Sequence, residues 1–346
     1  TDIYNLAYHH LKLSGDGPYY LMANTAITGD LTIDSGAAFD VSASNFGFTL
    51  AGNWSNSSVF YARSGTVTFN SSGTQTLNTG GMSFYRINHS GTGTLQLTSN
   101  LTVTNDLTNS GIFDLNGYAW TMTDATFSNP GTVKLKGTEA INNLTQDLGQ
   151  GLWEYVGSGT TKITLQPFGP PDYYNLKISG AATEIFDLTA NLMVANNFTI
   201  TSGDFQPGTR NTTVSGMLNI AGGKFTGSSG SLTVKDLKLD SGTLAAPTGT
   251  FSVSGDWMKT GGTFTPGTGT VTFNGGIGTI QELTSGGAAF YNLTHADSGT
   301  LKLADALDVN GNFSQSAGAF NANGKDQNFA GHFSLSSGTT YTKGGT

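Results

Sequence analysis

The sequence has no cysteine, so no disulfide bond and no thiolate-bound metal site is available to this chain. Charged residues make up only 11%, against about a quarter in an average protein. The 15 Lys and Arg residues are outnumbered by 23 Asp and Glu, which gives a net charge of −8. This balance provides no basic stripe to neutralise phosphates and argues against a nucleic-acid partner. No run of about eighteen apolar residues is present, so we expect no membrane-spanning segment.

Glycine is abundant, with 49 residues, and hydrophobic residues account for 36% of the chain. The 21 Phe, 12 Tyr and 4 Trp make the sequence too apolar and aromatic for a disordered Gly/Ser linker. We therefore expect a folded protein with many tight turns. The chain opens on "TDIYNL" without a charged and then apolar leader, so we expect either that a targeting segment was removed or that this is a piece of a longer protein.

A repeat of about twenty residues runs through the second half of the chain. One apolar column recurs at steps of 20, 20, 19, 20, 20, 16 and 20 residues, and its members are Val194, Val214, Val234, Val253, Phe273, Leu293, Val309 and Phe329. A second apolar column and a glycine column follow it at fixed offsets. The first half carries the unit less regularly, through Leu50, Phe69, Ile87, Val103 and Met122. A longer repeat, starting at Tyr4, Tyr85, Tyr174 and Tyr291, is superposed on the short one.

Within each unit, apolar residues alternate with Thr, Ser or Asn, as in "GTVTFN" at 65–70, which is typical of a strand with one buried face. Helix is disfavoured because Gly and β-branched residues are dense. An antiparallel meander would not require the same chemistry to return every twenty residues, whereas stacked turns would. The sequence therefore predicts an all-β fold, a single-stranded coil forming one continuous parallel β-solenoid (β-helix) over 1–346 with about 20 residues per turn.

Known catalytic and ligand motifs are missing, so we predict no catalytic, cofactor-binding or metal-ligating residues and no enzyme activity. "GTFTPGTGTVTFNGG" at 262–276 satisfies neither nucleotide-loop pattern, and its copy at 64–72 marks its glycines as corner residues. His9, His89 and His295 follow the long-repeat tyrosines and suggest a repeated outward position. The carboxylate pairs of "DLKLD" at 236–240 and "DALD" at 305–308 could bind calcium or serve a glycosidase, but nothing selects them.

The twenty-residue repeat is interrupted over 138–173, an irregular segment rich in aromatic residues and proline. Aromatic side chains on such a protrusion suit a subunit contact or a sugar-stacking surface, or else they cap the local core of a bulged corner. A second irregularity, "SGDGPYYLMAN" at 14–24, offers two more tyrosines. The candidate interface or glycan contacts are Trp153, Tyr155, Phe168, Tyr173, Tyr19 and Tyr20.

The stretches "GTFTPGTGTVTFNG", "FYNLT" and "GTLKLADALDVNGNF" resemble the tandem Gly/Thr/Ser/Asn-rich repeats of bacterial extracellular proteins of the parallel β-solenoid surface and adhesin type. The resemblance covers nearly the whole chain except 138–173 and implies a stalk, fibre or sheath component. We therefore expect an extracellular or cell-surface structural protein, a rigid rod or a filament or surface-layer subunit that assembles with itself through open ends or laterally. The alternatives are an adhesin module that binds cell-surface glycan and, less favoured, a polysaccharide-degrading enzyme.

Overall fold

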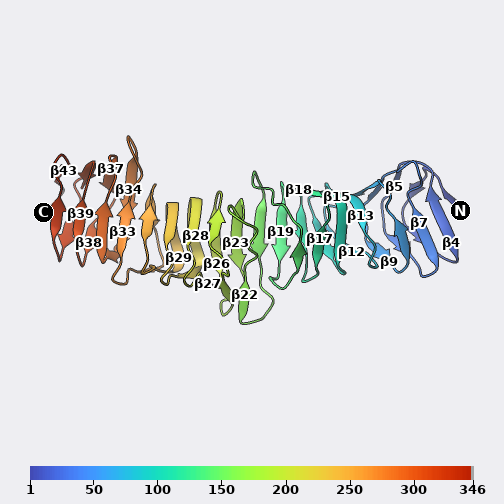
Figure 1. Ribbon diagram of the computed structural model, residues 1–346, viewed down its shortest axis with the longest axis horizontal. Helices are drawn as coiled ribbons and strands as arrows, with labels where there is room; N and C mark the ends of the chain where they lie inside the picture. The colour runs from blue at the N-terminus through green and yellow to red at the C-terminus, as the bar shows by residue number, and fades with distance from the viewer. Residues whose placement is uncertain (344–346) are drawn as a thin grey trace. The chain divides into compact units, whose positions relative to one another are not determined.

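The computed structural model describes residues 1–343, which contain strands and turns but no helix. Parallel strands stack as a β-solenoid of about 17 turns, with roughly 20 residues in each turn, which confirms the predicted fold class. The chain divides into two compact units, Thr1–Ser158 and Gly159–Thr346. Within each unit, successive turns lie side by side along the chain (Figure 1). The continuity of the coil between the units stays a prediction.

In the first unit, the coil has three faces, and each face is a parallel sheet. The first face contains β1 (Asp2–Ile3), β4 (Gly17–Leu21), β7 (Ala37–Asp40) and β10 (Val59–Tyr61). The second contains β2 (Ala7–Tyr8), β5 (Thr25–Ile27), β8 (Phe48–Leu50), β11 (Thr66–Phe69), β13 (Phe84–His89), β15 (Leu101–Asn109), β17 (Trp120–Met122), β18 (Thr126–Ser128) and β20 (Ile141–Asn142). The third contains β3 (Leu11–Leu13), β6 (Leu31–Ile33), β9 (Trp54–Asn56), β12 (Thr74–Asn78), β14 (Thr94–Leu97), β16 (Ile112–Asp114), β19 (Thr132–Leu135) and β21 (Leu152–Tyr155).

The second unit is also a parallel coil, and two long strands, β28 (Thr212–Thr226) and β29 (Leu232–Ala245), run around its corners. The strands before them are β22 (Lys162–Thr164), β23 (Asn175–Ser179), β24 (Ile185–Asp187), β25 (Leu192–Val194), β26 (Phe198–Ser202) and β27 (Asp204–Gln206). The strands after them are β30 (Phe251–Val253), β31 (Trp257–Lys259), β32 (Thr263–Thr265), β33 (Thr270–Phe273), β34 (Ile280–Thr284), β35 (Ala289–Phe290), β36 (Asn292–His295), β37 (Thr300–Leu303), β38 (Leu307–Val309), β39 (Phe313–Gln315), β40 (Ala319–Asn321), β41 (Gln327–Phe329), β42 (Phe333–Leu335) and β43 (Thr340–Thr342).

The register confirms the predicted apolar column from Val194 to Phe273. Val194 pairs with Val214, Val214 with Val234, and the column continues through Val253. Because parallel turns stack equivalent residues, these side chains form one continuous buried row.

The column is wrong after Phe273, which pairs with His295 rather than with Leu293, and it is wrong again at the 16-residue step. Leu293 pairs with Val271 and Phe313, whereas Val309 pairs with Phe290 and Phe329 in a different sheet. The 16-residue spacing is therefore not a short turn, because it connects residues of two different buried rows in two different sheets. A similar change of row occurs between Ile87 and Val103 in the first unit, where Ile87 pairs with Leu107.

The two units contain matching interior clusters. In the first unit, Trp54 contacts Phe60 at 4.8 Å and Phe84 at 5.0 Å between ring centroids. In the second unit, Trp257 contacts Phe264 and Phe290, each at 4.9 Å. Aromatic rings at these separations add packing energy beyond the burial of their area. Trp54, Phe60 and Phe84 of the first unit therefore correspond to Trp257, Phe264 and Phe290 of the second.

A buried glutamine repeats in the same way. Gln75 Nε2 donates hydrogen bonds to the carbonyls of Leu50 and Gly52, and Gln281 Nε2 donates to those of Val253 and Gly255. In each case the Oε1 atom accepts a backbone N–H from the preceding corner. The Leu50 and Val253 carbonyls also accept the N–H groups of Asn70 and Asn274, so the buried amide adds a second bond to these carbonyls and satisfies its own polar atoms.

Candidate functional site

Trp153 and Tyr155 lie inside the first unit, so the expectation that they form an exposed contact surface is wrong. Their side chains are 1% and 0% exposed. Both belong to β21, in which alternate residues point inward, and Trp153 stacks on Trp120 with ring centroids 6.4 Å apart. The alternative interpretation, that aromatic residues of the interruption fill the local core, holds for this pair.

Tyr173 is also buried and fixes the proline-rich segment of the second unit. Its hydroxyl donates a hydrogen bond of 2.6 Å to the Gln166 carbonyl, and its ring meets the half-buried Phe168 edge-on at 5.5 Å. Asp172, buried beside it, accepts N–H bonds from Gly169 and Met193. Burial raises the pKa of Asp172, although these hydrogen bonds favour its charged form. These side chains attach the segment to the coil.

The proline-rich segment covers a cavity of about 530 Å³ in the second unit. Its lining includes Pro167 and Pro170 of this segment together with Leu192 and Met193 of β25. Asp172 is the titratable group in this lining, and its oxygens already bind backbone N–H groups. The cavity therefore offers an apolar surface without a paired acid and base.

The histidines of the long repeat do not form an outward site. His89 and His295 are 1% and 0% exposed, whereas His9 is exposed, so the expected repeated position is wrong. His89 Nδ1 lies 2.7 Å from Asn109 Oδ1, and His295 Nε2 lies 3.5 Å from Asp297 Oδ1. Burial lowers the pKa of both rings. Each histidine stands two residues after an inward Ile87 or Leu293, and this alternation was the signal for burial.

Of the four carboxylates considered for catalysis, Asp236, Asp240 and Asp305 bind groups of neighbouring turns. Asp236 Oδ1 accepts the Asp256 N–H at 2.9 Å, and Asp305 accepts two corner N–H groups at 2.7 Å. Asp240 accepts from the Lys238 ammonium at 2.7 Å, and this neighbour lowers its pKa. Asp308 is exposed on β38. Residues 1–343 contain no group of three or more His, Cys, Asp or Glu placed to hold a metal ion.

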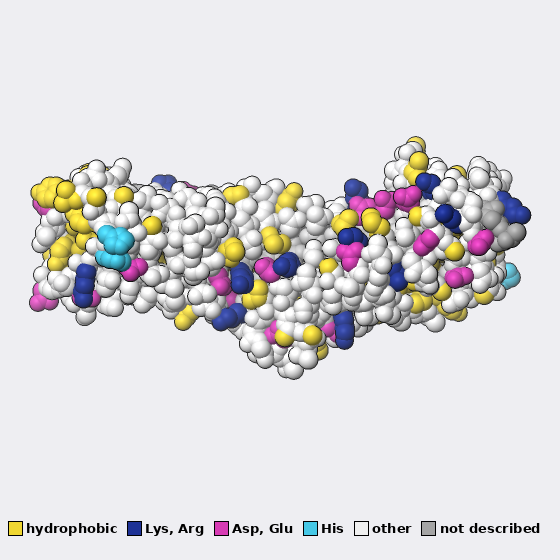
Figure 2. Space-filling model, turned by 180° about the vertical axis from the view of Figure 1, so that it is seen from behind, with side chains coloured by type: hydrophobic (Ala, Val, Ile, Leu, Met, Phe, Trp, Pro, Cys, Tyr) yellow, Lys and Arg dark blue, Asp and Glu magenta, His cyan; other side chains and the backbone are white. Residues whose placement is uncertain are grey.

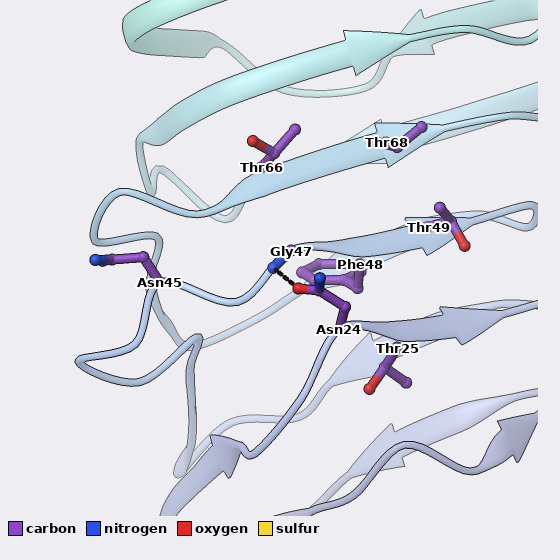
Figure 3. A pocket seen from close by; sticks show the side chains of 8 residues that line it. All are labelled: Asn24, Thr25, Asn45, Gly47, Phe48, Thr49, Thr66 and Thr68. Carbon is purple, nitrogen blue, oxygen red and sulfur yellow. Dashed lines mark hydrogen bonds between the residues drawn. The ribbon is translucent and has the colours of Figure 1, made fainter.

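One open pocket of about 410 Å³ lies on the second face of the first unit; we call it the threonine pocket. Its lining is polar except for Phe48, and comprises Asn24, Thr25, Asn45, Gly47, Phe48, Thr49, Thr66 and Thr68. The threonines come from the successive strands β5, β8 and β11, and Asn24 accepts the Gly47 N–H at 2.9 Å (Figure 3). No titratable side chain lines it, so it is suited to hydrogen bonding rather than to proton transfer.

A second surface lies on the first face, on the other side of the corner formed by residues 62–65. Tyr20 and Tyr61 occupy outward positions here on β4 and β10, and Tyr85 lies beside Tyr61 at the start of β13, on the second face; we call the three the tyrosine stripe. Tyr20 and Tyr61 are 37% and 52% exposed. Between these two strands, Asp40 on β7 pairs in register with both of them. Of the predicted pair at 14–24, Tyr20 is thus exposed.

Tyr19 points the other way, toward the interior. It pairs in register with the buried Phe39, and its hydroxyl donates a 2.7 Å hydrogen bond to the Ser14 carbonyl. The alternation along β4 separates the two neighbouring tyrosines onto opposite faces of the sheet. Tyr19 therefore contributes to packing and Tyr20 to the surface.

Arg63 forms an ion pair with Asp40 beside the tyrosine stripe. Its Nε and Nη2 atoms donate to the two oxygens of Asp40 at 2.5 and 2.6 Å, which is a bidentate pair. The guanidinium holds the pKa of Asp40 below its usual range. Next to it, a groove of about 510 Å³ is lined by Tyr61, Arg63, Tyr85 and neighbouring residues. Sequence reasoning missed this pair, because its partners are 23 residues apart.

Charge is otherwise dispersed over the surface. On the face seen in Figure 2, Lys and Arg side chains alternate with Asp and Glu among residues that are mostly uncharged. Arg86 next to the stripe pairs with Asp106 at 2.8 Å, and its guanidinium carbon lies 5.4 Å from the centre of the Tyr85 ring. The stripe therefore combines aromatic faces with balanced charge.

Comparisons with protein-family models, with curated protein sequences and with solved structures found no match to this chain. A search of residues 1–343 for a helix long and apolar enough to cross a membrane found none.

Proposed function

We propose that this protein is an extracellular structural component at a microbial surface, a rigid β-solenoid rod or a filament or surface-layer subunit. The single observation that carries this proposal is that neighbouring turns are bonded at their corners as well as along their strands. Asn191 accepts the backbone N–H of Asn211, whose own side chain accepts that of Ser231. Asn292 and Asn312 repeat the arrangement. A coil connected in this way needs no disulfide to stay ordered.

The proposal includes no catalytic step. The buried carboxylates Asp172, Glu139 and Glu184 each accept backbone N–H groups, so each serves the chain's own corners. A glycosidase needs two carboxyl groups facing one bond of the substrate. The composition of the chain, rich in Thr, Ser, Asn and Gly and poor in charge, supports an extracellular location.

We further propose that copies of the chain assemble end to end. In the last described turn, strands β41, β42 and β43 pair only with the preceding turn among residues 1–343. The inward-facing Phe333 and Leu335 of this turn are 37% and 41% exposed. In the first turn, Tyr4 and Leu6 are 56% and 60% exposed. Unpaired strand edges with apolar neighbours favour addition of another parallel turn, and such head-to-tail contacts generate filaments.

Negative-stain electron microscopy and light scattering of the full chain test this proposal. We expect fibres or a mass that rises with concentration, and we expect Phe333→Ser combined with Leu335→Ser to suppress both. Ile277→Ser is the matched control, because Ile277 is 90% exposed but lies in a corner away from the last turn. A wild-type chain that stays monomeric at high concentration contradicts end-to-end assembly.

A further inference from the structure

Two positions of the tyrosine stripe, Tyr20 and Tyr61, have counterparts in the second unit that carry small side chains. The matching aromatic clusters equate Phe60 with Phe264, so Tyr61 corresponds to Thr265. One turn back, Asp40 pairs with Tyr61 while Ala245 pairs with Thr265. Two turns before Tyr61 and Thr265, the corresponding residues are Tyr20 in the first unit and Thr226 in the second. The same scaffold positions thus carry Tyr, Asp and Tyr in one unit and Thr, Ala and Thr in the other.

Arg63 has a positive φ, as its counterpart in the second unit does, but that counterpart is a glycine; the arginine is therefore kept for its side chain. It has φ of 43°, a left-handed conformation that costs a residue with a Cβ about 1 kcal/mol. The corresponding residue of the second unit is Gly267, with φ of 60°, which carries no such cost. The first unit therefore keeps an arginine where the backbone favours glycine. The guanidinium lies over Asp40, and its Nη1 remains for other partners.

The stripe runs across the turns of the first unit. Neighbouring parallel strands are ~4.8 Å apart, so Tyr20 and Tyr61, two turns apart, are separated by ~10 Å along the coil. Tyr85 and Thr104 continue the line in the groove beyond Tyr61. This arrangement places aromatic faces and hydrogen-bonding groups along one direction, as a linear ligand requires.

The chemistry of the stripe favours a sugar chain over other linear ligands. Tyrosine has an apolar face and a polar end, so it can contact the C–H face of a pyranose and its hydroxyls together. Arg63 and Asp40 neutralise each other, as do Arg86 and Asp106, so no net charge selects an anionic ligand. A protein partner would need a large buried patch with apolar anchors, whereas this groove is open and its lining includes Ser83 and Thr104.

We infer that the tyrosine stripe binds a neutral polysaccharide whose chain lies across the turns, with pyranose rings against Tyr20, Tyr61 and Tyr85 and with Arg63 donating to sugar hydroxyls. This site lies within the first unit and is independent of the end-to-end assembly proposed above. It would attach the structural protein to a surface or matrix glycan.

Isothermal titration of the full chain with linear hexasaccharides tests the site, with cellohexaose, xylohexaose and mannohexaose as neutral probes and hexagalacturonate as the charged probe. We expect at least one neutral probe to bind, and Tyr61→Thr, which introduces the residue of the second unit, to weaken it about tenfold through loss of one stacking contact. Arg63→Gly fits the positive φ and should also weaken binding while circular dichroism stays unchanged.

Tyr291→Thr is the matched control, since Tyr291 is the counterpart of Tyr85 in the second unit and is 38% exposed. Its binding should equal that of the wild type. The inference is overturned if no neutral hexasaccharide binds, if hexagalacturonate binds more tightly than every neutral probe, or if Tyr61→Thr binds as tightly as the wild type. Because Tyr61→Thr leaves the end strands intact, its fibres should form normally, which separates failure of this site from failure of assembly.

Discussion

Substitution of Gly93 by alanine tests how closely the corners of the coil are stacked. A Cβ at this position would lie 1.9 Å from the carbonyl oxygen of Gly73 in the preceding turn, whereas real Cβ atoms stay at least 3.0 Å from such a neighbour. The corner must therefore move by the difference, 3.0 − 1.9, or about 1.1 Å. The Thr94 N–H donates to this same oxygen at 3.0 Å, so the movement disrupts an inter-turn hydrogen bond.

The expected cost combines two terms. Forcing atoms into a packed site costs ~1–3 kcal/mol, and losing one ladder hydrogen bond costs ~1 kcal/mol. Gly93→Ala should therefore lower the free energy of unfolding by ~2–4 kcal/mol. Gly73→Ala is the control, because the nearest atom to its new Cβ is 3.7 Å away and alanine restricts the unfolded chain, which stabilises by ~0.4–1 kcal/mol.

Urea unfolding monitored by tryptophan fluorescence measures this difference, since Trp54 and Trp120 are buried in the same unit. The midpoint of Gly93→Ala should fall well below that of the wild type, and the midpoint of Gly73→Ala should equal or exceed it. Equal midpoints for the two variants would refute the close stacking of corners on which the fold depends.

Two further predictions concern the buried polar groups. Gln75→Leu and Gln281→Leu each remove three buried or partly buried hydrogen bonds and should each lower the free energy of unfolding by ~3 kcal/mol. Hydrogen exchange should become faster at the backbone amide that donates to the glutamine Oε1. A cost below ~0.5 kcal/mol in either variant contradicts the equivalence of the two glutamines. Because burial lowers the pKa of His89 and His295, the unfolded chain binds protons more readily than the folded one. Stability should therefore be full above the unfolded histidine pKa of ~6.5 and fall as the pH drops below it. Combined His89→Gln and His295→Gln should flatten this dependence between pH 7 and 5 in urea titrations, and an unchanged slope rules out the histidines as its cause.

If the tyrosine stripe binds glycan, the two units have different roles on one architecture. The second unit carries Thr226 and Thr265 at the counterparts of Tyr20 and Tyr61 and retains the interior clusters, so it preserves the scaffold without the complete stripe. Function placed on a common scaffold by outward substitutions is a general pattern in repeat proteins. The outward columns, rather than the inward ones, are therefore where variants should alter binding without altering stability.

The sequence by itself determined the period, the strand alternation and the parallel stacking, because side chains that share a row must be chemically alike in every turn. The same alternation already indicated that Trp153 and Tyr155, two residues apart, share a face. Only the tertiary structure decided which row each apolar residue joins, since Leu293 and Val309 differ in row while looking equivalent in sequence. It also decided the Arg63–Asp40 pair, because contacts between turns depend on register and on corner geometry, which a single periodic pattern does not specify.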